Sequence, residues 1–182
     1  RERQSLKQLK TIATVRSVGA STRIEGSTMS DEEVEALLNR LDISKIEDRD
    51  SQEVVGYFET LEIISESYNE MNISENSIKN LHNILLKYSE KDEWHKGDYK
   101  QHSNAVEASL PDGTKQVIFR TTEAGFATED AMRQLIEWYH KETDIHPLVK
   151  CALFTYEFVT IHPFQDGNRR LRSIITNFII KA

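Results

Sequence analysis

The chain has 182 residues, of which 38% are hydrophobic and 29% are charged, and its formal net charge is −7 at pH 7. This composition excludes an intrinsically disordered segment and fits one soluble globular domain, spanning 1–182, with a buried core. The acidic balance argues against nucleic acid or an anionic membrane as partner. The sequence contains no run of roughly 18 apolar residues, the length that a membrane-spanning helix needs.

Helical periodicity dominates, since only 7 Gly and 3 Pro interrupt the chain. A first helix is predicted over about 4–24. A second follows Ser30, because Ser30 and Glu33 form a capping-box pattern ahead of an apolar run. A further helix is predicted after His146, because Pro147 suits a first helical turn. The remaining helices are predicted over about 51–71, from 74, from 128 and over 168–180.

One region departs from the helical pattern. Two short strand-like runs flank "LPDGT", and a Pro-Asp-Gly turn between such runs is typical of a β-hairpin. The predicted fold is therefore all-α with one β-hairpin over about 104–121. The single cysteine, Cys151, allows no intrachain disulfide and lies in an apolar run, so we expect it to be buried in a protein of the reducing cytoplasm.

The stretch "IHPFQDGNRRLRS", residues 161–173, concentrates the chemistry of the chain. Gly167 and Asn168 permit a tight turn just before a helix, and a helix N-terminus binds anions through its free N–H groups. Arginines at 169, 170 and 172 add donors suited to phosphate. Asp166 can hold Mg²⁺, the usual partner of a polyphosphate, and His162 lies close enough to take a proton from an attacking hydroxyl. These residues indicate phosphoryl or nucleotidyl transfer, with a plain helix N-terminus and surface arginines as the alternative.

The same residues resemble the signature of the Fic (Fic/Doc) family, H-P-F-x-[D/E]-G-N-G-R-x-x-R. The segments "GDYK" at 97–100, "LHNILL" at 81–86 and "HPLVKCALFTYEFVTIHPF" at 146–164 are similar to the family's core. The resemblance implies a compact helical bundle with a hairpin flap, and a protein adenylyltransferase that moves AMP from Mg–ATP to a Ser, Thr or Tyr hydroxyl of a target protein.

Roles for single residues follow from this resemblance alone. His162 is expected to be the general base, Asp166 to bind Mg²⁺, and Phe164 to anchor the loop in the core. The flap is expected to hold the target by strand addition. The expected nucleotide contacts are Gly167, Asn168, Arg169, Arg170 and Arg172, and the expected flap contacts are Val117, Ile118 and Phe119.

A second, shorter resemblance lies in "STRIEG", residues 21–26, which fits the family's inhibitory pattern [S/T]-x-x-x-E-[G/N]. It implies an N-terminal inhibitory helix over about 4–26, with Ser21, Glu25 and Gly26 as its elements and Glu25 as the latch on the last arginine of the signature. An ordinary helix end with Gly26 as its cap is the alternative.

The chain departs from the signature at two positions, where Arg169 replaces a glycine and Ser173 replaces the last arginine. One residue is about 100° of helical rotation, so Arg172 does not simply take the place of an arginine at 173. Three hypotheses remain: an adenylyltransferase with an altered nucleotide site, an AMP-removing enzyme, and a non-catalytic nucleotide-binding or interaction module. Self-association is left open.

Overall fold

The structure, a computed structural model, describes residues 2–24, 26–39, 46 and 48–181. Seven α-helices and one two-stranded antiparallel sheet make up this part of the chain, which confirms the expected all-α fold with a single hairpin. The bounds are α1 Glu2–Arg23, α2 Asp31–Asn39, α3 Arg49–Ser67, α4 Glu75–Leu85, β1 Ala105–Ser109, β2 Lys115–Arg120, α5 Phe126–Lys141, α6 Pro147–Ile161 and α7 Asn168–Lys181, with short 3₁₀ turns at Tyr68–Glu70 and Glu90–Asp92.

The helix starts follow from local side-chain chemistry. Ser30 N–H donates to Glu33 Oε2 at 2.8 Å and Glu33 N–H donates to Ser30 Oγ at 3.2 Å, so the predicted capping box is present. Ser74 caps α4 by accepting from Ser77 N–H, and His146 caps α6 by accepting from Leu148 N–H. Each cap satisfies an amide that has no partner inside its helix.

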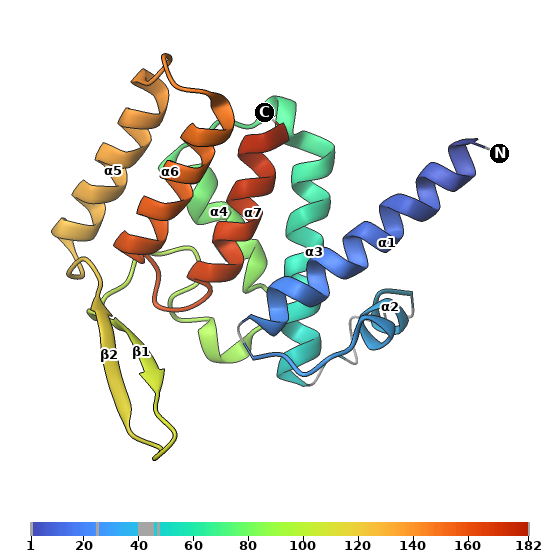
Figure 1. The fold of residues 1–182 in the computed structure, drawn as a ribbon, viewed down its shortest axis with the longest axis horizontal. Helices are drawn as coiled ribbons and strands as arrows, with labels where there is room; N and C mark the ends of the chain where they lie inside the picture. The colour runs from blue at the N-terminus through green and yellow to red at the C-terminus, as the bar shows by residue number, and fades with distance from the viewer. Residues whose placement is uncertain (1, 25, 40–45, 47, 182) are drawn as a thin grey trace.

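The helices form one bundle (Figure 1). α6 packs between α5 and α7, α3 packs on α4 and α7, and α1 crosses α3 and α7 near its C-terminal end. Cys151 is buried, as expected. Fully buried side chains from several helices and from the α6–α7 loop fill the centre: Val54, Ile64, Leu81, Phe154, Phe158, Phe164, Leu171, Ile174 and Phe178.

The hairpin projects from the bundle beside α5 and α6 (Figure 1). Ala105 pairs with Arg120 and Ser109 with Lys115, and a register shift lies between Val106 and Glu107. Gly113 has φ +82°, which its place in the tight turn after Leu110 requires and which glycine adopts without strain. All six residues of β2 are exposed, so the hairpin is held by its own ladder and by its base.

α3 and α4 cross at a glycine. A Cβ placed on Gly56 would lie 2.1 Å from the carbonyl oxygen of Leu85, closer than any real contact between these atoms. Gly56→Ala should therefore force the two helices apart and lower the free energy of unfolding by about 1–3 kcal/mol, measured by urea denaturation. Gly19→Ala in α1 is the control, because its Cβ would meet only the ends of the Arg23 and Asp31 side chains. Equal losses in the two variants would contradict the proposed crossing constraint.

Candidate active site

A short loop, 162–167, joins α6 to α7 and carries most of the predicted site residues. Asn168, just after the loop, holds its middle: Asn168 Oδ1 accepts from Phe164 N–H at 2.9 Å, and Asn168 Nδ2 donates to Phe164 O at 2.7 Å. Asn168 is 2% exposed and Phe164 is fully buried. Asn168 thus shapes the loop from within, while the N–H groups of the first turn of α7 have no acceptor inside that helix.

His162 ends α6 in the left-handed region, with φ 54° and ψ 60°. Its Nδ1 lies 3.3 Å from Val159 O, and because a carbonyl oxygen only accepts, we assign the ring proton to Nδ1. Nε2 then carries the lone pair. Burial lowers the pKa of His162, and the positive charges of Lys100 and Arg169 lower it further, so the neutral imidazole is favoured. This is the protonation state that a general base needs.

A second histidine supports the loop from α4. Gly97 N–H donates to His82 Nδ1 at 2.9 Å, so Nε2 carries the proton and donates to Asp166 O at 3.0 Å. The His82 ring also stacks on Phe164, with centroids 3.9 Å apart and planes inclined by 16°. Burial lowers the pKa of His82 to about 4 and keeps the ring neutral, so these two hydrogen bonds hold one tautomer in place.

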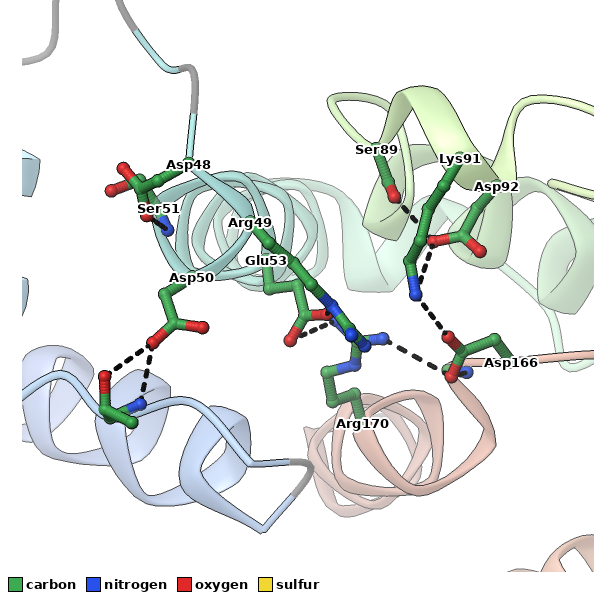
Figure 2. A network of polar contacts seen from close by, with 12 residues as sticks. Asp48, Arg49, Asp50, Ser51, Glu53, Ser89, Lys91, Asp92, Asp166 and Arg170 are labelled. Atoms are coloured by element: carbon green, nitrogen blue, oxygen red, sulfur yellow. Dashed lines mark hydrogen bonds and ion pairs between the residues drawn. The ribbon is translucent and has the colours of Figure 1, made fainter.

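Asp166 lies between two cations. Its Oδ2 accepts from Lys91 Nζ at 3.2 Å, and its Oδ1 accepts from Gly167 N–H at 2.6 Å and lies 3.7 Å from Arg170 (Figure 2). Burial opposes ionisation, but the Arg170 guanidinium, the Gly167 amide and Lys91 together hold the pKa of Asp166 below its usual value. Asp166 is therefore an ionised carboxylate. Its Oδ2, the oxygen that Lys91 contacts, is the one that faces away from Gly167 and Arg170.

This carboxylate suits a nucleotide-borne magnesium ion. Among the described residues, no group of three or more His, Cys, Asp or Glu side chains could hold a metal alone. Mg²⁺ at phosphate sites commonly takes one or two carboxylates and completes its shell with phosphate oxygens and water. Asp166 fits that role once Lys91 Nζ leaves Oδ2, since the opposite oxygen is already committed to Gly167 and Arg170.

Arg170 points into the protein and not into the loop. Its side chain is fully buried and its Nη1 lies 3.1 Å from Oε2 of Glu53, which is itself 3% exposed and is held on its other oxygen by Arg49 (Figure 2). Among the described residues and their atoms, none accepts a hydrogen bond of good geometry from the Arg170 guanidinium. The expected contact of Arg170 with phosphate thus requires that Arg170 exchange a buried carboxylate for the ligand.

The remaining residues of the signature diverge around α7. Arg169 is exposed, while Arg172 borders a surface hollow with Phe119 of β2 and Tyr156 of α6. Ser173 lies on the side of α1, close enough to the Tyr57 hydroxyl to oppose the rise that burial causes in the pKa of Tyr57. Arg172 and Ser173 therefore face different neighbours, in agreement with their separation on the helix.

The inhibitory pattern is described only in part. Ser21 accepts a hydrogen bond from the Tyr57 hydroxyl at 2.9 Å, which anchors α1 on α3. Gly26 has φ +100° and donates its N–H to Arg23 O at 3.1 Å, as a helix cap does. Glu25, the expected latch, lies outside the described residues.

The flap residues are exposed, as a docking strand must be. Val117, Ile118 and Phe119 are 45%, 61% and 41% exposed. They belong to β2, the strand that leads back to the bundle at the start of α5 (Figure 1). The flap thus exposes apolar side chains, and Phe119 borders the same surface hollow as Arg172.

Sequence reasoning missed four supporting residues: Glu53, His82, Lys91 and Lys100. The sequence placed His82 in a helix and gave it no role, because its partner Asp166 is 84 positions away. Their signal is polarity at a buried position: His82 lies on the apolar face of α4, and Glu53 lies next to two buried valines. Buried polar side chains need partners, so such positions point to a network before the partners are known.

Comparisons with known proteins agree on one family. A model described as Fic/DOC family matches residues 72–180. Protein adenylyltransferase fic-1 of Caenorhabditis elegans is 27% identical over 168 residues, which cover 86% of this chain and 30% of that protein. Protein adenylyltransferase Fic of Drosophila melanogaster is 24% identical over 180 residues, which cover 97% and 34%. The chain thus spans about a third of the length of these curated relatives.

Two solved structures have the same fold. A Fic-domain-containing signalling protein of Bacteroides thetaiotaomicron superposes with a TM-score of 0.78 at 26% identity, covering 97% of this chain and 65% of that one. A Fic family protein of Desulfovibrio desulfuricans superposes with a TM-score of 0.79 at 27% identity, covering 99% and 51%. Within the described ranges, no helix combines the length and the apolar character that crossing a membrane requires.

The buried neutral His82 makes stability depend on pH. Its folded pKa of about 4 lies below the ordinary 6.5, so as the pH falls through this window the unfolded chain takes up a proton that the folded chain refuses. At 1.36 kcal/mol per pH unit, the loss is on the order of 3 kcal/mol. We expect the difference in unfolding free energy between the parent and His82→Gln to shrink between pH 6.5 and 4, measured by urea denaturation. A difference that is constant over this range would contradict the assignment.

Proposed function

The chain belongs to the Fic/DOC family, and on that premise we propose that it is a protein adenylyltransferase, which transfers AMP from ATP to a hydroxyl group of a target protein. The observation that carries the proposal is His162, a neutral imidazole whose Nδ1 is directed at Val159 O, beside the first turn of α7. The names of the two curated relatives support the same activity.

The proposed chemistry is a single displacement at phosphorus. The target hydroxyl oxygen attacks the α-phosphorus of ATP and forms a new P–O bond. The bond from the α-phosphorus to the bridging oxygen breaks, and pyrophosphate leaves with that oxygen. The hydroxyl proton passes to Nε2 of His162. Transfer of this kind depends mainly on positioning and on charge stabilisation.

The other residues of the loop would bind and orient the nucleotide. The first-turn N–H groups of α7 and the backbone at Gly167 and Asn168 would contact phosphate oxygens. Arg169 is exposed, and it lies near enough to His162 for its charge to lower the pKa of that imidazole. Asp166 would hold the magnesium ion that accompanies ATP, and this ion, when bound, would neutralise charge on the phosphates. An extended stretch of target protein would lie along β2 by strand addition.

Two observations favour a second candidate, a nucleotide-binding or interaction module without transferase activity. Arg170 is committed to Glu53, and Ser173 stands where the family signature has a second arginine. Both expected arginine contacts with the polyphosphate are thereby weakened. A module of this kind would bind a nucleotide or a protein and would have no use for the base at His162.

The first test removes the base. His162→Ala should lower single-turnover AMP transfer by ~10²–10⁴-fold, because a positioned general base contributes about that factor. Its affinity for Mg–ATP, measured by calorimetry, should change little. The control is His102→Ala, which alters an exposed imidazole next to Trp94. Transfer by His162→Ala at the parental rate would show that His162 is not the base, and absence of transfer in every variant, including those that also carry Glu25→Gly, would favour the binding module.

The second test restores the signature. Arg169→Gly with Ser173→Arg should raise the transfer rate more than it raises ATP affinity. The glycine allows phosphate to approach the backbone closely, and the arginine orients the terminal phosphate of ATP. We propose that Glu25 restrains the enzyme, so both proteins should carry Glu25→Gly. Rates come from single turnovers with labelled ATP and affinities from calorimetry. A restored protein no faster than its parent would mean that the two departures are harmless.

A further inference from the structure

Lys100 holds the backbone on both sides of His162. Its own N–H donates to Pro163 O at 2.8 Å, and its ammonium group donates to Ile161 O at 3.1 Å. These two carbonyl groups flank His162 in the chain. One residue from the segment before the hairpin therefore contacts the peptide group just before His162 and the peptide group that joins Pro163 to Phe164.

The backbone of His162 needs such support. Among the described residues, His162 is the only non-glycine residue with a positive φ. The left-handed region costs a residue with a side chain on the order of 1–2 kcal/mol, and such conformations persist where neighbouring contacts impose them. One further contact, from His162 N–H to Phe158 O at 3.0 Å, fixes the same turn from α6.

The same ammonium group also joins the two ends of the flap. It donates to Asn104 Oδ1 at 3.1 Å, just before β1, and to Thr121 Oγ1 at 2.8 Å, just after β2. An ammonium has three N–H donors, and here each of them has one acceptor: Asn104, Thr121 and Ile161. Lys100 thus connects both strands of the hairpin to the residue before His162.

The charge of Lys100 is buried and forms no ion pair with any carboxylate in the described part of the chain. The residue is 2% exposed, its three side-chain acceptors are neutral, and none of the described carboxylates lies within ion-pair distance of its Nζ. Burial lowers the pKa of Lys100 to about 8, so the charged form dominates at neutral pH at a cost to stability. A neutral side-chain amide has only two N–H donors, so an ammonium is the group that can serve all three acceptors at this place.

We propose that Lys100 is a positioning residue for the transfer reaction: it orients His162 and fixes the flap relative to it, so that a hydroxyl carried by a peptide on the flap meets Nε2. This inference rests on the proposed function. Its cation also disfavours a proton on His162, together with Arg169, while Asp166 acts in the opposite direction. Lys100 touches neither the nucleotide nor the target, and acts through His162 and the hairpin.

The test compares Lys100→Met with Lys100→Arg, and uses Lys96→Met as control, because Glu93 is the one ion-pair partner of Lys96 among the residues that the structure describes. NMR titration of the His162 ring and hydrogen exchange of the flap amides are the structural readouts. We expect Lys100→Met to raise the pKa of His162 and to speed flap exchange. Lys100→Arg should keep that pKa low, because the charge remains, while the three-acceptor geometry is lost.

The kinetic readout separates positioning from binding. Lys100→Met should lose on the order of 10²-fold in the rate of AMP transfer at saturating ATP, the size of effect that a small misplacement causes, with ATP affinity within about twofold of the parent. Lys100→Arg should recover part of that rate. Parental transfer and an unchanged His162 titration in Lys100→Met would overturn the inference.

Two further outcomes are distinguishable. If Lys100→Met does not fold, Thr121→Val removes a single acceptor of the ammonium and should still slow transfer and speed flap exchange; no effect of Thr121→Val would then overturn the inference. If the parent and its Glu25→Gly form transfer no AMP, the proposed function fails. The NMR titration and the exchange rates then decide by themselves whether Lys100 orients His162.

Discussion

The reciprocal amide contact between Asn168 and Phe164 is the constraint on which the candidate site depends. It closes the α6–α7 loop upon itself, and it places Phe164 in the core, where the His82 ring stacks on it. With Phe164 fixed, His162 stands at one end of the loop and Asp166 at the other. The arrangement of the candidate site is therefore set by a buried side-chain amide and an aromatic anchor, neither of which takes part in the proposed chemistry.

Charge is distributed around this loop in alternation. Starting from α3 the order is Arg49, Glu53, Arg170, Asp166 and Lys91, so each of the three inner groups has opposite charges on either side (Figure 2). Such a chain stabilises its buried members mutually, and it keeps Arg170 paired with Glu53, whereas Arg169 is exposed to an incoming phosphate. A polyanion that binds here competes with Glu53 and Asp166 for cations already in use, which makes nucleotide affinity depend on the cost of separating these pairs.

Local patterns predicted most of the fold because local chemistry determines it. The capping box at Ser30, the His146–Pro147 start of α6 and the Pro-Asp-Gly turn all act within a few residues, and each is present in the structure. Helix α5 begins at Phe126, two residues before the expected Thr128, after Gly125 at φ +79°.

The supporting residues of the site depend on tertiary contacts that no local pattern contains. Lys91 and Asp166 are 75 positions apart and Lys100 and Ile161 are 61 apart. The sequence expected Arg170 near phosphate because the signature places it there. The structure buries it against Glu53, a residue on a helix more than a hundred positions earlier in the chain.

The burial of Arg170 against Glu53 limits which substitutions the two positions can accept over evolutionary time. Breaking a buried ion pair by removing one partner costs about 3–5 kcal/mol, whereas replacing both partners with apolar residues of similar volume is often neutral. Positions 53 and 170 are thus linked: a neutral residue at either one costs less stability if the other changes with it. In divergent relatives of this chain, the two positions should be inherited as a pair.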